Sequence, residues 1–237
     1  MADISAFWRI VLAVLPSVVT LGAVIVAFLA YRHGRKAQQF ANTQKFLFDN
    51  YWNRPMGALK EVVDPETKLP IRTLRHARDI FRFTSGLSRG DLNHKELLRF
   101  WNQSIIAGTP ENAVAWEMSA ALEHMGLAAF HNALSLEFCL CNSSATIAAD
   151  WLRIAWYVRA IRTDDMSPCA EWRESALGAD EKNYYLRRHG EWLALTAALW
   201  YRKMFANDPY AAVDALIEAY GGEEAVRRTR RRLEKSH

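Results

Sequence analysis

One uncharged, apolar stretch near the N-terminus constrains this chain more than any other feature. It runs from Ile10 to Tyr31 and reads IVLAVLPSVVTLGAVIVAFLAY. As a helix rising about 1.5 Å per residue it would be about 33 Å long, slightly more than a hydrocarbon core of about 30 Å. A helix at the surface of a water-soluble core carries a polar stripe, and this stretch has none. The sequence therefore predicts one transmembrane helix.

Residues around the stretch predict how it lies in a membrane. Trp8 and Tyr31 bracket it as aromatic anchors at the two interfaces. Charge is distributed unequally, with Asp3 and Arg9 before the stretch and Arg32, His33, Arg35 and Lys36 after it. Because basic residues favour the cytoplasmic side, we expect a single-pass protein of the plasma membrane. Its N-terminus would lie outside and its C-terminal domain in the cytoplasm.

Within the stretch, Pro16 predicts a kink, since proline lacks a backbone donor and clashes with the preceding turn. Gly22, Ala23 and Ala27 form a small-residue face that could let the helix of a second copy approach, as in a homodimer. A cleaved signal peptide is the main alternative to an anchor. Its apolar region would be only about 7–15 residues long and would end in a small-x-small site, which residues 27–30 do not offer.

The rest of the chain predicts one helical domain. About 200 residues remain after the anchor, enough for a single core, and the chain is 51% hydrophobic with nine tryptophans. We expect four segments: the N-terminal flank and anchor over 1–34, a membrane-proximal helical stalk over 35–55, a helical cytoplasmic domain over 56–222, and a basic C-terminal helix or tail over 223–237.

Helical periodicity and cap residues predict an all-α, multi-helix bundle, and no stretch alternates apolar and polar residues as a strand would. Asn93, three residues before Glu96, and Thr109, before Pro110, are expected to begin two helices. The other expected elements are a helix over Ile71–Leu87, a helix over Pro110–Leu140, a break at Asn142–Ser144, a central helix over Ala145–Arg162 with Arg153, Arg159 and Arg162 facing water, a helix over Glu181–Phe205, and a stop at Gly221–Gly222.

The order of several segments resembles a group of known families. These segments are Leu122-Glu123-His124-Met125-Gly126 in one helix, a second helix through Trp151 and Ile154 to Arg159, and a later long helix with Trp192 and Trp200, all following an anchor and a basic stalk. The arrangement resembles bacterial families described only as domains of unknown function, with one N-terminal membrane helix and an all-helical cytoplasmic domain. The resemblance spans Phe7 to Phe205. It implies a bacterial inner-membrane protein and no catalytic residue.

The cysteines predict thiols with a structural role. Cys139, Cys141 and Cys169 form an odd set, and the first two lie too close in sequence for an ordinary disulfide. Reduced thiols fit a cytoplasmic domain. A zinc site would need more ligands at metal spacing, and no CxxC pair occurs.

One polar set resembles a site more than the others. Glu117, His124 and His131 are spaced seven apart on one expected helix face, with Glu123 beside them. Carboxylate di-metal bundles use paired Glu-x-x-His repeats, and neither these nor His-Glu-x-x-His occurs. Gly-x-Ser-x-Gly and the glycine-rich phosphate loops are absent too. The sequence thus predicts no catalytic, cofactor-binding or metal-binding residue, and these four are expected to be ordinary polar side chains.

The C-terminal run is the strongest concentration of charge, and three interpretations of it remain open. It could be a solvated helix in which Glu223 pairs with Arg227 and Glu224 with Arg228. It could bind anionic lipid, since an anchor would hold it near a negative leaflet. Nucleic acid is disfavoured because the run lacks aromatic residues that stack on bases. The residues expected at anionic lipid are Arg32, Arg35, Lys36, Arg227, Arg228, Arg230, Arg231 and Arg232.

Two functional hypotheses follow from the anchor and from the lack of a motif. In the first, the chain is a membrane-anchored helical protein that acts by binding a protein partner, as a scaffold, accessory subunit or regulator. In the second, it is a membrane-associated enzyme or defence effector with a helical active site, for which Glu117, Glu123, His124 and His131 are the available residues. The sequence names neither a partner nor a substrate.

Overall fold

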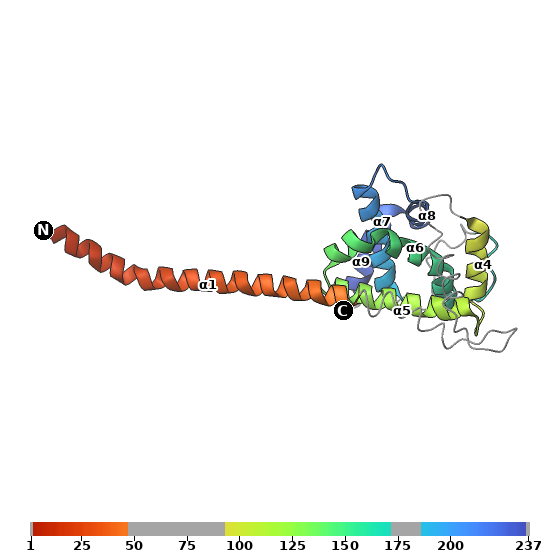
Figure 1. The fold of residues 1–237 in the computed structure, drawn as a ribbon, viewed down its shortest axis with the longest axis horizontal. Coiled ribbons are helices and arrows are strands. Elements are labelled where there is room, and N and C mark those ends of the chain that lie inside the picture. The colour runs from red at the N-terminus through yellow and green to blue at the C-terminus, as the bar shows by residue number, and fades with distance from the viewer. Residues whose placement is uncertain (1, 47–92, 172–185, 236–237) are drawn as a thin grey trace.

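A computed structural model describes residues 2–46, 93–171 and 186–235, with the side chains of the first helix described from Leu21 onward (Figure 1). The described residues form helices and no β-strand, which confirms the all-α fold class. The expected helix over Ile71–Leu87 and the start of the one over Glu181–Phe205 lie outside them. The helices are α1 (Ala2–Phe46), α4 (His94–Ser104), α5 (Pro110–Phe130), α6 (Leu136–Thr163), α7 (Arg188–Met204), α8 (Ala211–Tyr220) and α9 (Gly222–Glu234).

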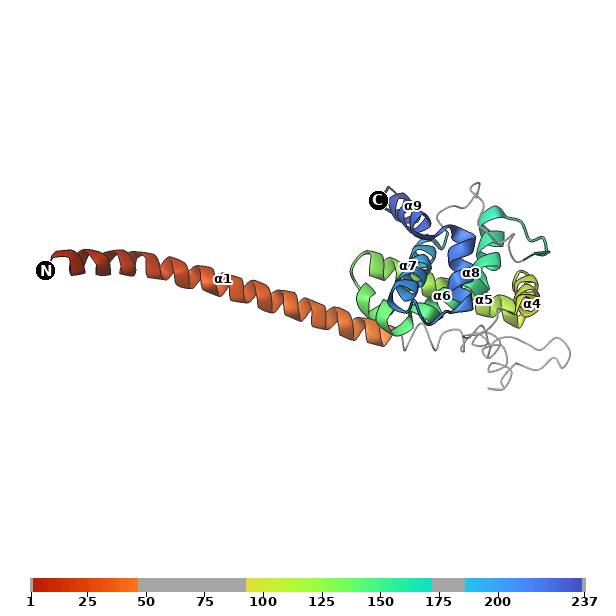
Figure 2. The same cartoon turned by 90° about the horizontal axis from the view of Figure 1, so that it is seen from above.

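Helix α1 extends away from the other helices as a single long rod (Figures 1 and 2). Most of its length has no neighbour among the other described helices, and its apolar side chains from Leu21 to Tyr31 are exposed. Val26 is 66% exposed and Phe28 61% exposed. Over the residues whose side chains the structure describes, 21–46, 93–171 and 186–235, no helix combines the length and the apolarity needed to cross a membrane.

The C-terminal end of α1 is attached to the domain at the turn between α5 and α6. The Thr43 side chain is fully buried, and its Oγ1 accepts a hydrogen bond from the Ser135 backbone N–H at 2.8 Å. Gln39 Nε2 donates to the Asn132 carbonyl at 2.5 Å. The ring of Phe40 packs edge-on against Phe138, with 4.3 Å between centroids. Polar and aromatic contacts together hold this end of α1 against α6.

The other helices form a bundle in which α5, α6 and α7 pack against one another, and α4, α8 and α9 cover them (Figures 1 and 2). Trp101 of α4 and Trp151 of α6 are fully buried. Each indole N–H has a partner, because Trp101 Nε1 donates to the Leu152 carbonyl and Trp151 Nε1 donates to the Tyr220 hydroxyl. Their rings therefore fill the core without leaving a polar atom unsatisfied.

Helices α5 and α7 approach each other most closely at two glycines. A Cβ atom on Gly126 would lie 2.2 Å from the His189 carbonyl oxygen, and one on Gly190 would lie 3.1 Å from the Glu123 nitrogen. No side chain fits at the first position while the backbones stay where they are. Gly126 inside α5 is thus required by packing, and this contact sets the position of the N-terminal end of α7.

Cap residues explain several helix ends. Asn93 Oδ1 accepts from the Glu96 N–H, and Thr109 Oγ1 accepts from the Asn112 N–H with Pro110 at the first helical position, as expected. Gly221 ends α8 in the left-handed region, with φ of 87°, and the chain then turns directly into α9.

The expected helix over Pro110–Leu140 and the expected break at Asn142–Ser144 are both wrong. The chain turns at residues 131–135, where Asn132 has φ of 59° and Ser135 caps α6. Helix α6 then continues through Ser143 and Ser144, whose side chains are buried in the bundle. Asn142 Nδ2 donates to the Phe138 carbonyl one turn earlier, which lets an asparagine remain helical.

Candidate functional site

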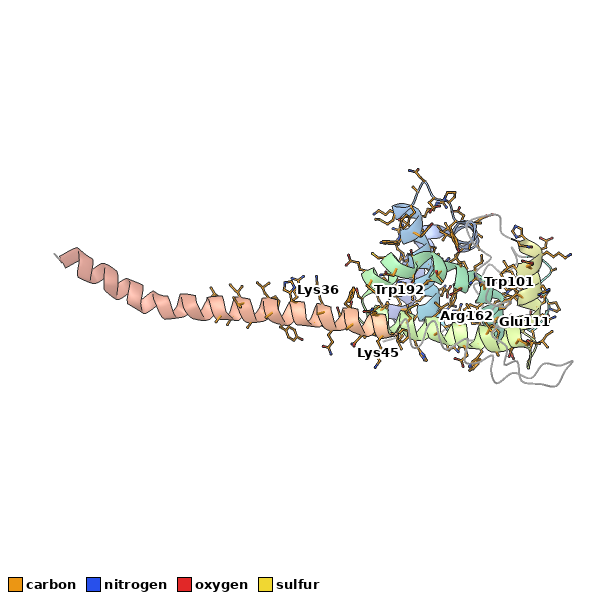
Figure 3. All side chains as sticks on the ribbon, viewed as in Figure 1. Lys36, Lys45, Trp101, Glu111, Arg162 and Trp192 are labelled. Carbon is orange, nitrogen blue, oxygen red and sulfur yellow. The ribbon has the colours of Figure 1, made fainter. Side chains whose placement is uncertain are left out.

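The predicted membrane and lipid residues keep their places along α1 and α9. Trp8 and Pro16 lie within α1 in the part whose side chains are not described. Ala23, Ala27 and Tyr31 are exposed, and open space surrounds Gly22. The basic residues that follow, Arg32, Arg35 and Lys36, are exposed, and Lys36 and Lys45 project from the rod (Figure 3).

The four polar residues of the sequence-based site do not converge. His124 and His131 are exposed, and Glu117 is half-buried on the same helix. Glu123 turns toward another helix, α7, and the ring of His131 lies near His189 of that helix, with 6.3 Å between centroids. Among the described residues, no group of three or more His, Cys, Asp or Glu side chains could hold a metal ion.

Glu123 pairs with a histidine that the sequence pattern did not indicate. Its Oε1 lies 2.8 Å from His189 Nδ1, and its Oε2 accepts from the Gly190 N–H at 2.9 Å. A carboxylate in this position fixes the orientation of the imidazole. The other ring nitrogen, Nε2, is buried, and the ring packs edge-on against Phe130. The pair therefore ties α5 to α7, and a substrate has no direct access to Nε2.

A second polar cluster lies deeper, between α6 and α7. Arg162 Nη1 and Arg188 Nη1 lie 3.0 and 2.5 Å from Glu191 Oε2, and all three side chains are at most 5% exposed. Arg162 Nε also donates to the Leu186 carbonyl at 2.7 Å. Figure 3 shows Arg162 among the packed helices. Because buried charges are stable only when paired, this cluster fixes the N-terminal end of α7 against α6.

The expectation that Arg153, Arg159 and Arg162 face water is wrong for two of the three. Arg162 is fully buried, and Arg153 is 4% exposed and paired with Asp150. Arg159 is half-buried, with its guanidinium 4.6 Å from the Trp156 ring centroid. Other helices cover α6 on nearly all sides, so the arginines that were expected to face water contact protein side chains instead.

An exposed aromatic residue lies at the surface end of this polar region. Trp116 of α5 is 52% exposed, and the Arg187 guanidinium lies 5.5 Å from its ring centroid. Arg187 Nε also donates to Ser119 Oγ at 3.2 Å. The charge of Arg187 also acts on Tyr157 of α6. Burial raises the pKa of the Tyr157 hydroxyl, and the positive charge of Arg187 opposes that rise. Trp116 and Arg187 thus present an aromatic and cationic surface formed by α5 and the residue that precedes α7.

The cysteines are free thiols, as expected for reduced residues. Cys139 and Cys169 are buried, whereas Cys141 is exposed. Burial raises the pKa of the Cys139 thiol to about 12. Cys169 belongs to a strap across α4, where Asn102 Oδ1 accepts from its N–H and Asn102 Nδ2 donates to its carbonyl. Two of the three therefore pack as small apolar residues.

A shallow pocket of about 140 Å³ opens between the end of α7 and the start of α8. Tyr201, Phe205 and Tyr210 pack against one another along its wall. Arg202 and Asp214 form an ion pair of 3.3 Å there. Pockets that bind drug-sized ligands have volumes of about 300–1,000 Å³. This pocket is too small for most organic ligands.

Helix α9 carries five arginines and three glutamates. Its arginines at 227, 228, 230 and 231 are exposed, and the one at 232 is half-buried. Glu223 pairs with Arg227 as one interpretation predicted, at 3.5 Å. Glu224 pairs with Arg227 and Arg231 instead of Arg228.

In comparisons with known proteins, no family model, no curated protein and no solved structure matches the chain. The resemblance to bacterial domains of unknown function therefore stays a prediction.

Proposed function

We propose that this chain is a single-pass, membrane-anchored helical protein that acts by binding a protein partner at the cytoplasmic face of the membrane. The anchor is the uncharged stretch from Ile10 to Tyr31, of which the side chains are described from Leu21 onward. The stretch belongs to one uninterrupted helix, α1, whose described apolar side chains face outward on all sides. Exposed apolar surface of this extent needs a cover, and lipid covers all sides of a single helix.

The attachment of α1 to the domain supports a positioning role for this helix. Thr43 is buried against the α5–α6 turn, and Phe40 packs on Phe138. Helix α1 continues without a break from the apolar stretch to these contacts. A domain held in this way keeps a fixed orientation relative to α1 and stays close to the bilayer, which suits a scaffold or an accessory subunit.

The observation that carries the binding proposal is the exposed ring of Trp116, with the half-buried Arg187 beside it. Tryptophan and arginine are the residue types most enriched at interaction hot spots. Here the tryptophan is held at the surface by a rigid helix, and Ser119 and the aromatic face fix the guanidinium. Little side-chain freedom remains to be lost on binding, so a partner would gain most of the contact energy.

Purification of the full-length protein from native membranes in mild detergent tests the proposal, with mass spectrometry of the proteins that accompany it. We expect stoichiometric companions. The Trp116→Ala variant should lose them, because a hot-spot truncation costs about 2 kcal/mol or more, roughly a thirtyfold loss of affinity.

The matched control is Ile106→Ala, which removes an apolar side chain of similar exposure, 50%, from another part of the surface. It should retain the companions. Both variants are checked for an unchanged unfolding temperature. A full-length protein that purifies alone contradicts binding as its mode of action, and equal retention by both variants contradicts the assignment to Trp116.

A further inference from the structure

Helix α9 is held on the bundle by one stripe of small and apolar residues. Ala225, Thr229 and Leu233 recur every four residues and are buried, with α7 as the main neighbour of α9. Thr229 Oγ1 donates to the Ala225 carbonyl at 2.9 Å, so its hydroxyl is satisfied inside the helix. The opposite face is consequently fixed in direction and is part of the folded surface.

That opposite face carries four exposed arginines and three exposed glutamates, and the ion pairs between them are weak. Arg230 lies 2.9 Å from Glu234, and both side chains are more than half exposed. The pairs of Arg227 and Arg231 with Glu224 are longer, at 3.7 and 3.6 Å, and equally exposed. Exposed pairs of this kind contribute little to stability, because solvent and salt screen them. Exchanging a glutamate for a phosphate therefore costs these arginines little.

Arg228 differs from its neighbours, since it forms no ion pair or hydrogen bond with any residue in the described segments. Phosphate oxygens are strong acceptors for a guanidinium. Arg228 and Arg231 lie one turn apart on the exposed side, so both can meet one flat anionic surface.

The position of α9 relative to α1 indicates which anionic surface this is. In both views α9 lies at the end of the domain from which α1 extends (Figures 1 and 2). From Tyr31, where the apolar stretch ends, to Gln39, where the domain contacts begin, α1 rises only about 12 Å. The Debye length at physiological salt is about 8 Å. This end of the domain therefore lies about one and a half Debye lengths from a charged leaflet at Tyr31, where the field is weakened to about a fifth, and a modest tilt brings α9 closer to the headgroups.

We propose that the exposed face of α9, together with the basic residues of α1 at 32, 35 and 36, binds the phosphate groups of anionic lipid headgroups and so fixes the tilt of the domain on the membrane. The inference rests on the proposed anchoring by α1. A long nucleic acid would have to approach the same face from the side that the bilayer occupies, which favours lipid as the ligand.

The test measures how close α9 lies to the headgroups in the full-length protein. A fluorophore is attached at Lys235→Cys in a Cys141→Ser background. Cys139 and Cys169 are buried and stay unlabelled. The protein is placed in nanodiscs of phosphatidylcholine alone or with added phosphatidylserine, each with a trace of lipid carrying a headgroup quencher. We expect stronger quenching in the anionic discs, reversed by high salt.

Arg228→Gln with Arg231→Gln should weaken the headgroup-bound state by about fivefold for each arginine removed. The matched control, Lys95→Gln with Arg99→Gln, removes the same charge from exposed positions on α4, at the far end of the domain (Figure 1). The fluorophore of this control should be quenched as strongly as that of the parent protein in the anionic discs. Quenching that does not depend on disc composition, or that falls equally in both double variants, overturns the inference.

The outcomes separate the two proposals. If the chain does not enter discs of either composition, the anchoring fails and the lipid contact fails with it. If it enters both and α9 stays distant from headgroups, only the lipid contact is overturned. If added duplex DNA changes the quenching of the fluorophore and phosphatidylserine does not, the lipid contact is also overturned, and the basic face is assigned to nucleic acid.

Discussion

Gly126 shows how one missing side chain sets the separation of two helices. The backbone of α7 passes so close that a Cβ atom would lie 2.2 Å from the His189 carbonyl. The same crossing brings Glu123 to His189 Nδ1 and to the Gly190 N–H. The glycine thus permits the hydrogen bonds that join α5 to α7.

Gly126→Ala should destabilise the domain, because the atom it meets is backbone and cannot rotate away. Overpacking of a core costs about 1–3 kcal/mol, and we expect at least the upper half of that range. Thermal unfolding of the full-length protein in detergent, followed by circular dichroism, measures the loss.

Gly34→Ala is the matched control, since Gly34 lies in α1 with no atom near its Cβ position. Replacing an exposed helical glycine by alanine stabilises a helix by up to about 1 kcal/mol, so this variant should not unfold earlier. An unchanged transition for Gly126→Ala would contradict the close approach.

Single residues also mark where sequence reasoning was insufficient. Nothing in the spacing of Arg162 separates it from a solvated arginine, because its partner Glu191 lies on another helix. The segment Arg187-Arg188-His189-Gly190-Glu191 did carry a signal, since so many polar residues open an otherwise apolar helix. Pairing between distant segments is tertiary information, and charge pattern along one helix does not contain it.

At the scale of elements, the joint between α1 and the bundle is the feature that the sequence did not indicate. Continuation of the apolar helix beyond Tyr31 was expected, and α1 is one helix to Phe46. Its docking on the α5–α6 turn could not be expected, because the sequence pattern predicted one helix through that turn. The turn depends on a left-handed Asn132 and a cap at Ser135, and the same residue types also occur inside a helix, as Asn142 and Ser143 do in α6.

Thr43→Val should loosen this joint while keeping the shape of the side chain. The Ser135 N–H would lose its acceptor, which costs about 1–3 kcal/mol when the site stays closed. Backbone hydrogen exchange over Gln39–Phe46 should therefore become faster by about tenfold or more.

Gln44→Ala provides the comparison, because Gln44 is exposed on the same helix and one residue away. Its exchange rates should match those of the parent. If Thr43→Val leaves exchange at the joint as slow as Gln44→Ala does, the buried hydroxyl is not what fastens α1.

For the whole molecule, composition and periodicity predicted the all-α class, and cap residues predicted the starts of α4 and α5. The arrangement of the bundle follows from contacts between segments far apart in sequence, such as Trp101 with the Leu152 carbonyl. The proposed account has three parts: the apolar helix α1, its fixed joint with the bundle, and the bundle itself. The basic helix α9 lies at the end of the bundle from which α1 extends. Its central claim is that the rod is a membrane anchor.

Alkaline extraction of membranes from bacteria that express the full-length protein tests that claim most directly. Leu21→Lys with Ile25→Lys places two charges in the apolar stretch, each costing about 2.5–3.5 kcal/mol at the centre of a membrane helix. Gln38→Lys with Gln44→Lys adds the same charge to exposed positions of α1 outside the stretch. We predict that the parent and the second variant stay in the membrane pellet and that the first variant is released. Release of the parent protein by the alkaline wash would contradict the account.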